Sequence, residues 1–187
     1  VKPKNQNLAI LPEGLKPGGK LPVVYHPEYN ISFYGLEKIH PFDAGKWGKI
    51  FDILMSSGLL SATNFHMPRE ATKEQLLLVH SQSYLNKLKF CVILEVFLGY
   101  FYASGPTFQL TRERANRSAG AVCTWQAAGL ALDHGWAIHL GGGFHHASAD
   151  HGGGFCCYAD ITLAIQTLRG QGRISRAMIV DLDAHQA

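Results

Sequence analysis

The sequence predicts an α/β protein with a mostly parallel sheet, and two observations near the end of the chain carry this prediction. Residues 136–140 and 177–180 are short apolar runs of strand length, and residues 158–169 between them repeat apolar side chains at helical spacing. Gly170 is placed to end this helix. A strand, a helix and a second strand in one sheet make the two strands parallel.

One further strand and one helix are expected in the first third of the chain. Residues 21–25 form an apolar run that His26 and Pro27 end, because proline cannot donate to a strand ladder. The apolar residues of 47–54 then recur at i, i+3, i+4 and i+7, which predicts an amphipathic helix that stops at Gly58. Residues 1–20 are rich in Lys, Pro and Gly and indicate a mobile lead-in.

The middle of the chain predicts two more helices and contains one ambiguous run. Thr72 with Gln75 three residues later is a capping box, which opens a helix. Residues 118–134 are rich in Ala and Gly, whose small side chains allow a helix to pack closely on a sheet, and Gly135 should end it. Residues 90–102 are almost wholly apolar, and both a buried helix and a buried strand remain open for them.

Composition excludes several classes of function. With 187 residues and 47% hydrophobic content, the chain can bury the core of one domain or of part of a larger one. The net charge of +3 includes no basic stripe, which argues against direct nucleic-acid binding. Four cysteines without disulfide or CxxC spacing favour a reducing, intracellular setting. No apolar run reaches the ~20 residues that a membrane span needs.

Two polar clusters follow the strands expected at 136–140 and 177–180. His145 and His146 lie in a glycine-rich loop after the first strand, and the second strand closes on Asp181, Asp183 and His185. Ligands of parallel sheets bind at the carboxyl ends of the strands, so the clusters should meet. Alternate residues of a strand project to one side, and an Asp carboxylate with a His imidazole is an oxygen and nitrogen pair suited to Zn²⁺.

These motifs resemble those of one enzyme family. The His-His loop and the Asp-x-Asp-x-His sequence at 181–185, together with stretches at 11–20, 35–49, 70–72, 79–81 and 84–85, are similar to the amino-terminal part of the catalytic domain of zinc-dependent histone deacetylases, above all the class IV branch. The resemblance implies a three-layer α/β/α fold of the arginase/deacetylase type, with residues 21–187 a partial catalytic domain that is incomplete at its C-terminal side. Residues 90–117 depart from the family pattern.

The resemblance also implies roles for the polar residues. His146 would take the proton of a metal-activated water that attacks the acyl-lysine amide, with His145 as its electrostatic partner. Asp181 would pair with His145 and help to bind a monovalent cation such as K⁺. Asp183 and His185 would be zinc ligands, with the remaining ligand and the oxyanion-stabilising tyrosine in the half of the family domain that this sequence does not include.

Substrate contacts, partners and location are likewise expectations from the family. Gly154 would offer its carbonyl to the substrate amide, Phe155 would line the acyl channel, and Phe144 would border an inner pocket beneath the metal. The substrates would be acyl-lysine proteins such as histones, in the nucleus, the cytoplasm or both. Because only two zinc ligands are present, the chain on its own is expected to be inactive.

Two other functions stay open. The sequence Asp183-Ala184-His185 also resembles the manganese motif of arginase-type ureohydrolases, although those enzymes lack a Phe-His-His loop. A non-catalytic fragment that only binds partners is the third hypothesis.

Several polar and sulfur-containing residues have simpler interpretations. The isolated histidines are expected to be structural or solvated; they are His26, His66, His80 and His134. Asp160 is interpreted as a helix-start residue and the adjacent Cys156 and Cys157 as core residues.

Overall fold

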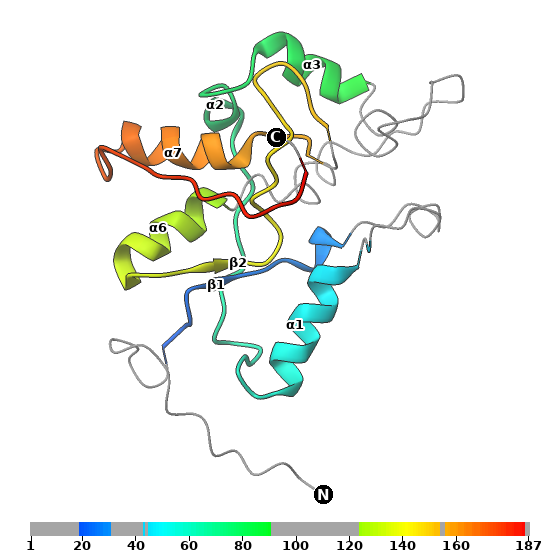
Figure 1. Cartoon of the computed structure of the whole chain (residues 1–187), viewed down its shortest axis with the longest axis vertical. Coiled ribbons are helices and arrows are strands. Elements are labelled where there is room, and N and C mark those ends of the chain that lie inside the picture. Colours follow the sequence, from blue (N-terminus) through cyan, green and yellow to red (C-terminus); the bar gives the residue numbers. More distant parts are fainter. Residues whose placement is uncertain (1–18, 31–42, 44, 91–123, 154–155, 186–187) are drawn as a thin grey trace, which may run out of the picture.

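The structure is a computed structural model, and it describes residues 19–30, 43, 45–90, 124–153 and 156–185 (Figure 1). The expectations for residues 1–18, for 91–117 and for the start of the Ala/Gly-rich helix at 118–123 therefore lie outside the described residues. No helix in the described ranges has both the length and the apolar composition that crossing a membrane requires.

A parallel pair of strands lies at the centre of the molecule. β1 (Val23–Val24) pairs with β2 (Ile138–His139), with Val23 opposite Ile138 and Val24 opposite His139. The backbone of His66 adds a further parallel bridge to Val24. The parallel sheet predicted for residues 136–140 is confirmed, but the partner strand comes from residues 21–25 and not from 177–180.

The strand expected at 177–180 is not formed. Residues 174–183 form no strand, and Met178 and Leu182 are 87% and 91% exposed. The apolar run at 177–180 favours extended backbone, but a strand also needs a neighbouring strand to complete its backbone hydrogen bonds. Within the described part of the chain, no strand pairs with this segment.

The first helical elements confirm the local sequence signals. A 3-10 turn, η1 (Pro27–Tyr29), follows β1, and α1 (Lys46–Ser56) covers the predicted amphipathic segment, with Gly58 left-handed at φ 76° just beyond it. α2 (Lys73–Leu76) opens with the predicted capping box: the Thr72 side chain accepts from the Gln75 amide, and the Gln75 side chain accepts from the Thr72 amide. α3 (Gln82–Phe90) follows.

The last two helices pack against each other. α6 (Thr124–His134) ends at Gly135, which is left-handed at φ 80° as the sequence predicted. α7 (Asp160–Gly170) lies beside α6 in Figure 1, and Arg173 beyond its end donates hydrogen bonds to the Gly129 carbonyl and the Asp133 carboxylate of α6. The prediction that Gly170 ends α7 as a cap was wrong: Gly170 is its last helical residue, and Gly172 takes the left-handed conformation at φ 67°.

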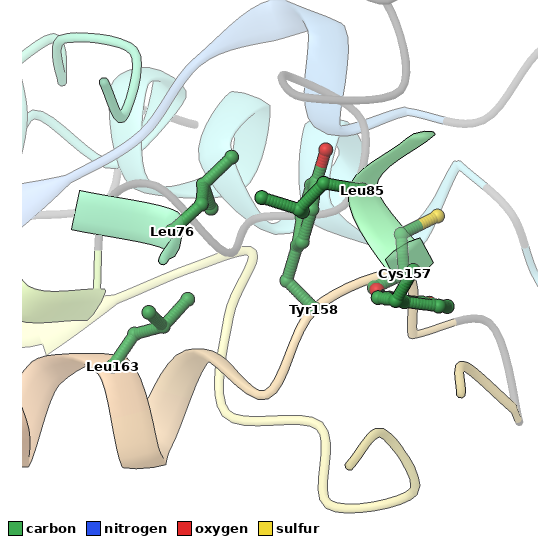
Figure 2. Packing of buried hydrophobic residues seen from close by; sticks show 6 residues of the cluster. Leu76, Leu85, Cys157, Tyr158 and Leu163 are labelled. Atoms are coloured by element: carbon green, nitrogen blue, oxygen red, sulfur yellow. Dashed lines mark hydrogen bonds between the residues drawn. The ribbon is translucent and has the colours of Figure 1, made fainter. Parts of the chain in front are cut away.

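Two groups of buried side chains hold these elements together. One group surrounds β1 and joins Val24, Tyr25 and Tyr29 to Trp47 of α1 and Ala127 of α6. The second, shown in Figure 2, gathers side chains of α2, α3 and α7 with the segment before α7; it comprises Leu76, Tyr84, Leu85, Cys157, Tyr158 and Leu163. The predicted core positions of Cys156 and Cys157 are confirmed, since both are buried.

Candidate active site

The glycine-rich loop after β2 lies directly on buried and partly buried side chains. A Cβ atom on Gly141 would collide with the ring of Tyr29, and one on Gly142 would collide with His139 and Thr124. Gly143 is left-handed at φ 87°, a conformation that other residues rarely adopt. The first two glycines are therefore required by close packing beneath the loop, and the third by its backbone conformation.

The loop brings the predicted histidine pair to the acidic segment. His145 Nδ1 lies 2.6 Å from Asp181 Oδ2, and His145 Nε2 lies 3.2 Å from His146 Nε2. The ring centroids of His146 and His185 are 6.1 Å apart. The His145 side chain is only 10% exposed, whereas that of Asp181 is 41% exposed. All five polar residues predicted in this region therefore gather at one place, although the expected second strand is absent.

Asp183 and His185 form a local pair in a turn. Asp183 Oδ1 lies 2.6 Å from His185 Nδ1 and accepts a hydrogen bond from the His185 amide at 2.7 Å. The Asp183 amide donates to Asp181 Oδ1 at 3.0 Å, which links the two acids through the backbone. The side chains of Asp183 and His185 are 52% and 77% exposed, so both are accessible to a metal ion or to other parts of a protein.

The charges of this cluster follow from its contacts. The hydrogen bond from His145 holds the pKa of Asp181 below its usual value, and the backbone amide of His185, followed by its imidazole, does the same for Asp183. Partial burial, and then the neighbouring His145 and His185, lower the pKa of His146. At neutral pH the two acids are therefore ionised and His146 is neutral, so that it can accept a proton.

Asp183 and His185 are ligands of the kinds that zinc prefers, but they are fewer than a catalytic zinc site needs. Carboxylate oxygen and imidazole nitrogen are ordinary zinc ligands, and a catalytic zinc has three protein ligands. Among the residues that the structure describes, no group of three His, Cys, Asp or Glu side chains is arranged to hold a metal ion. Asp183 and His185 thus supply at most part of a metal site.

The three residues predicted to contact substrate are only partly described. Phe144 packs edge-on against Trp47 with ring centroids 5.9 Å apart, and Lys46 Nζ lies 5.7 Å from the Phe144 ring centre. Phe144 therefore ties the loop to α1 and the core around β1. Gly154 and Phe155 lie outside the described residues.

Sequence reasoning missed a row of polar residues beneath the loop. Asp160 does begin α7 as predicted, but it is buried and accepts hydrogen bonds from Gly143 and Thr124. His139 of β2 lies between Thr124 and Tyr29. Burial lowers the pKa of His139 to about 4 and raises that of Asp160 to about 6. A histidine within an apolar strand was the available signal, since a polar side chain there needs a buried partner.

The isolated histidines that the structure describes carry no sign of a shared site. The structural prediction is confirmed for His80, which is buried, contacts the Ala149 carbonyl through Nδ1 at 3.1 Å and accepts from the Ala159 amide through Nε2 at 3.1 Å. His26 caps η1 by accepting from the Glu28 amide. His66 bridges to β1 through its backbone, and His134 is exposed at the end of α6.

Comparison with known proteins gives consistent matches over most of the chain. The model of the histone deacetylase domain matches residues 40–187. The chain is 45% identical to histone deacetylase 2 of Arabidopsis thaliana over 174 residues, which are 91% of this chain and 44% of that protein. It is 31% identical to the acetoin utilization protein AcuC of Bacillus subtilis over 171 residues, covering 87% of this chain and 43% of AcuC.

A solved structure shows the same fold. The crystal structure of an HDAC homolog from Aquifex aeolicus superposes with a TM-score of 0.56 at 21% identity, covering 82% of this chain and 42% of that one. The chain therefore spans less than half of the length of these three proteins.

Proposed function

Because this chain belongs to the histone deacetylase family, we propose that it forms part of the catalytic domain of a zinc-dependent hydrolase that removes acyl groups from lysine side chains. The observation that supports this most is the gathering of the His145 and His146 pair with Asp181, Asp183 and His185. These residues come from two segments about 35 positions apart in the sequence, and His145 bonds directly to Asp181 at 2.6 Å. Amide hydrolysis needs a proton acceptor beside an activated water, and this cluster offers both an acceptor and metal donors.

Asp183 and His185 would hold the zinc ion together with a ligand from outside the described residues. A bound zinc would polarise a water molecule toward hydroxide. Asp181 lies next to this pair through the Asp183 amide, and we propose that it also helps to hold a monovalent cation such as K⁺. The exposure of both zinc donors leaves room for the remaining ligand to approach.

His146 would accept the proton of the attacking water and return it to the lysine amine that leaves. Its neutral state at pH 7 suits the first step, because a protonated imidazole cannot act as a base. His145 donates from Nδ1 to the Asp181 carboxylate, which fixes the orientation of its ring, and its Nε2 faces His146. The pair would therefore hold His146 in a fixed position while the charge on its ring changes.

Substrate binding and location complete the proposal. Phe155 would line the channel for the acyl chain and Gly154 would accept from the substrate amide. Phe144, which packs against Trp47, would border an inner pocket beneath the metal. The substrates would be acyl-lysine proteins such as histones, met in the nucleus, the cytoplasm or both. Residues 21–187 would be the part of the catalytic domain that this chain contributes.

Metal analysis tests this proposal against its alternatives. In a protein extended to the length of the relatives, we expect one zinc ion per molecule by mass spectrometry. Asp183→Ala and His185→Ala should each lose it, because two protein ligands are fewer than a catalytic zinc requires. His134→Ala is the matched control, since His134 is exposed at the end of α6 and takes no part in the hydrogen bonds that join the cluster.

Each other outcome of the metal analysis points to a different function. Two manganese ions would indicate a ureohydrolase-like enzyme, and no metal at all would indicate a protein that only binds partners. Stoichiometric zinc in both Asp183→Ala and His185→Ala would show that the metal lies elsewhere.

A further inference from the structure

A continuous row of polar groups, buried at Tyr29 and Asp160 and partly buried at Thr124 and His139, lies beneath the loop that carries the histidine pair. Tyr29 Oη lies 3.0 Å from His139 Nε2, and His139 Nδ1 lies 3.1 Å from Thr124 Oγ1. Thr124 Oγ1 lies 2.5 Å from Asp160 Oδ2, and the same carboxylate oxygen accepts from the Gly143 amide at 2.7 Å. The row therefore joins η1, β2, α6 and α7 to the loop.

The ionised Asp160 carboxylate at one end of the row and the neutral ring of His139 within it fix the direction of every hydrogen bond in the row. An ionised carboxylate only accepts, so the Thr124 hydroxyl donates to Asp160 and can accept from His139 Nδ1–H. Burial of the His139 ring lowers its pKa to about 4, so the ring is neutral at pH 7 and has a single N–H, which leaves Nε2 bare to accept from the Tyr29 hydroxyl. Because each donor meets one acceptor, the row has one consistent arrangement.

Keeping a carboxylate here is costly to the fold. Asp160 is 2% exposed, and its other oxygen accepts from the Ile161 amide at 2.8 Å. Burial raises its pKa to about 6 even though the amides of Gly143 and Ile161 and the Thr124 hydroxyl favour the charged form. The ionised carboxylate lowers the stability of the folded protein, yet it accepts a hydrogen bond from the Gly143 amide of the loop. This combination indicates a role other than holding α7 in place.

The same row forms the surface on which the loop rests. The backbone of Gly141 lies on the Tyr29 ring, and that of Gly142 lies on His139 and Thr124, so closely that neither position has room for a Cβ atom. Gly143, which bonds to Asp160, is only two residues before His145. Any displacement of this amide is therefore passed along a very short segment to the histidine pair.

We propose that Asp160 is a positioning residue for His145 and His146, which acts through the Gly143 amide and is itself oriented by Thr124, His139 and Tyr29. The placement of the loop follows from these contacts alone. Its consequence for catalysis rests on the proposed function.

Nuclear magnetic resonance on the isotopically labelled 187-residue chain tests the placement without any activity. In the wild type, long-range nitrogen-proton spectra should show His139 as the neutral form protonated at Nδ1, in contrast to the Nε2-protonated form that free imidazole side chains favour. In Asp160→Asn the amide signal of Gly143 and the ring signals of His145 and His146 should shift. Asp133→Asn is the matched control, because Asp133 is exposed on neighbouring α6 and bonds to Arg173, and it should leave these signals unchanged.

Several results would overturn the placement. Protonation of wild-type His139 at Nε2 would break the direction of the row, and this measurement needs no variant that must fold. Unchanged Gly143 and His145 signals in folded Asp160→Asn would show that Asp160 only stabilises α7. Thr124→Val, which keeps the shape of the side chain but removes its hydroxyl, should alter the His139 ring signals, and unchanged His139 signals would likewise contradict the proposal.

Activity measurements separate this inference from the proposed function. In a protein extended to the length of the relatives, Asp160→Asn should lower kcat by about 10²-fold with KM and zinc content unchanged, since a displacement of about 1 Å can cost that much. If the wild type shows no deacylation while the spectra shift as expected, the proposed function fails and the placement stands. If the wild type is active and Asp160→Asn has a normal kcat, the positioning role is wrong and the proposed function stands.

Discussion

Gly142→Ala should destabilise the protein strongly, because the loop backbone rests on the buried row. The added Cβ would meet His139 Nδ1, His139 Cε1 and Thr124 Oγ1 at distances that real Cβ atoms do not show. Overpacking of this kind costs about 1–3 kcal/mol. Moving His139 or Thr124 aside would also weaken their 3.1 Å contact, with a further loss of about 1 kcal/mol. We therefore expect a total of about 2–4 kcal/mol.

Denaturant unfolding followed by circular dichroism measures this difference, and Gly170→Ala provides the matched control. Gly170 is the last residue of α7, its φ is not positive, and a Cβ there would meet no atom within 4 Å. Alanine at that position should be neutral or should stabilise by up to about 1 kcal/mol. A Gly142→Ala protein as stable as the wild type, within about 0.5 kcal/mol, would refute the close packing of the loop on His139 and Thr124.

Two further predictions concern stability. Thr72→Ala should cost about 1 kcal/mol in denaturant unfolding, because it removes the side chain that accepts from the Gln75 amide, and an unchanged midpoint would contradict the observed cap. Burial raises the pKa of Asp160 from 3.8 to about 6, so its contribution to stability is fully present below about pH 4 and is lost as the pH rises through about 6. The free energy of unfolding of Asp160→Asn, relative to that of the wild type, should therefore rise by about 3 kcal/mol between pH 4 and pH 7. If the difference between the two proteins were the same at both pH values, the raised pKa would be refuted.

Elements governed by local signals were predictable from the sequence. The apolar spacing of α1, the capping box at Thr72 and the stop at Gly135 each depend on a few neighbouring residues, and each is present. The parallel β2 was predicted from the same kind of pattern, because an apolar run of strand length between turn residues suits a buried strand. Such signals are strong because nothing distant in the sequence is needed to satisfy them.

Elements that depend on distant partners were predicted less well. Residues 177–180 have the composition of a strand, but their hydrogen bonds require a neighbouring strand that the described residues do not provide. Gly170 and Gly172 are equally suited to a helix end by residue type. In the structure Gly172 takes the left-handed conformation beyond α7, and its amide donates to the Arg169 carbonyl. The pattern of residues along the chain does not show whether these distant hydrogen-bond partners are present.

The candidate site divides in the same way. Adjacent histidines in a glycine loop and the Asp-x-Asp-x-His sequence are visible in the sequence, and the structure brings them together. The row that supports them is not visible, because Tyr29, Thr124, His139 and Asp160 belong to four different elements and each has an ordinary local explanation. Only the fold shows that these four side chains are in contact.

The most direct test of the central claim is the turnover of acetyl- and myristoyl-lysine peptides by His146→Ala in a protein extended to the length of the relatives. We predict that deacylation falls by about 10²-fold or more, because proton transfer by a positioned side chain contributes about 10² to 10⁴ in rate. Zinc content should stay at the wild-type level, since Asp183 and His185 are unchanged. Near-normal turnover of both peptides by His146→Ala would contradict the assignment of this histidine as the proton acceptor of an acyl-lysine hydrolase.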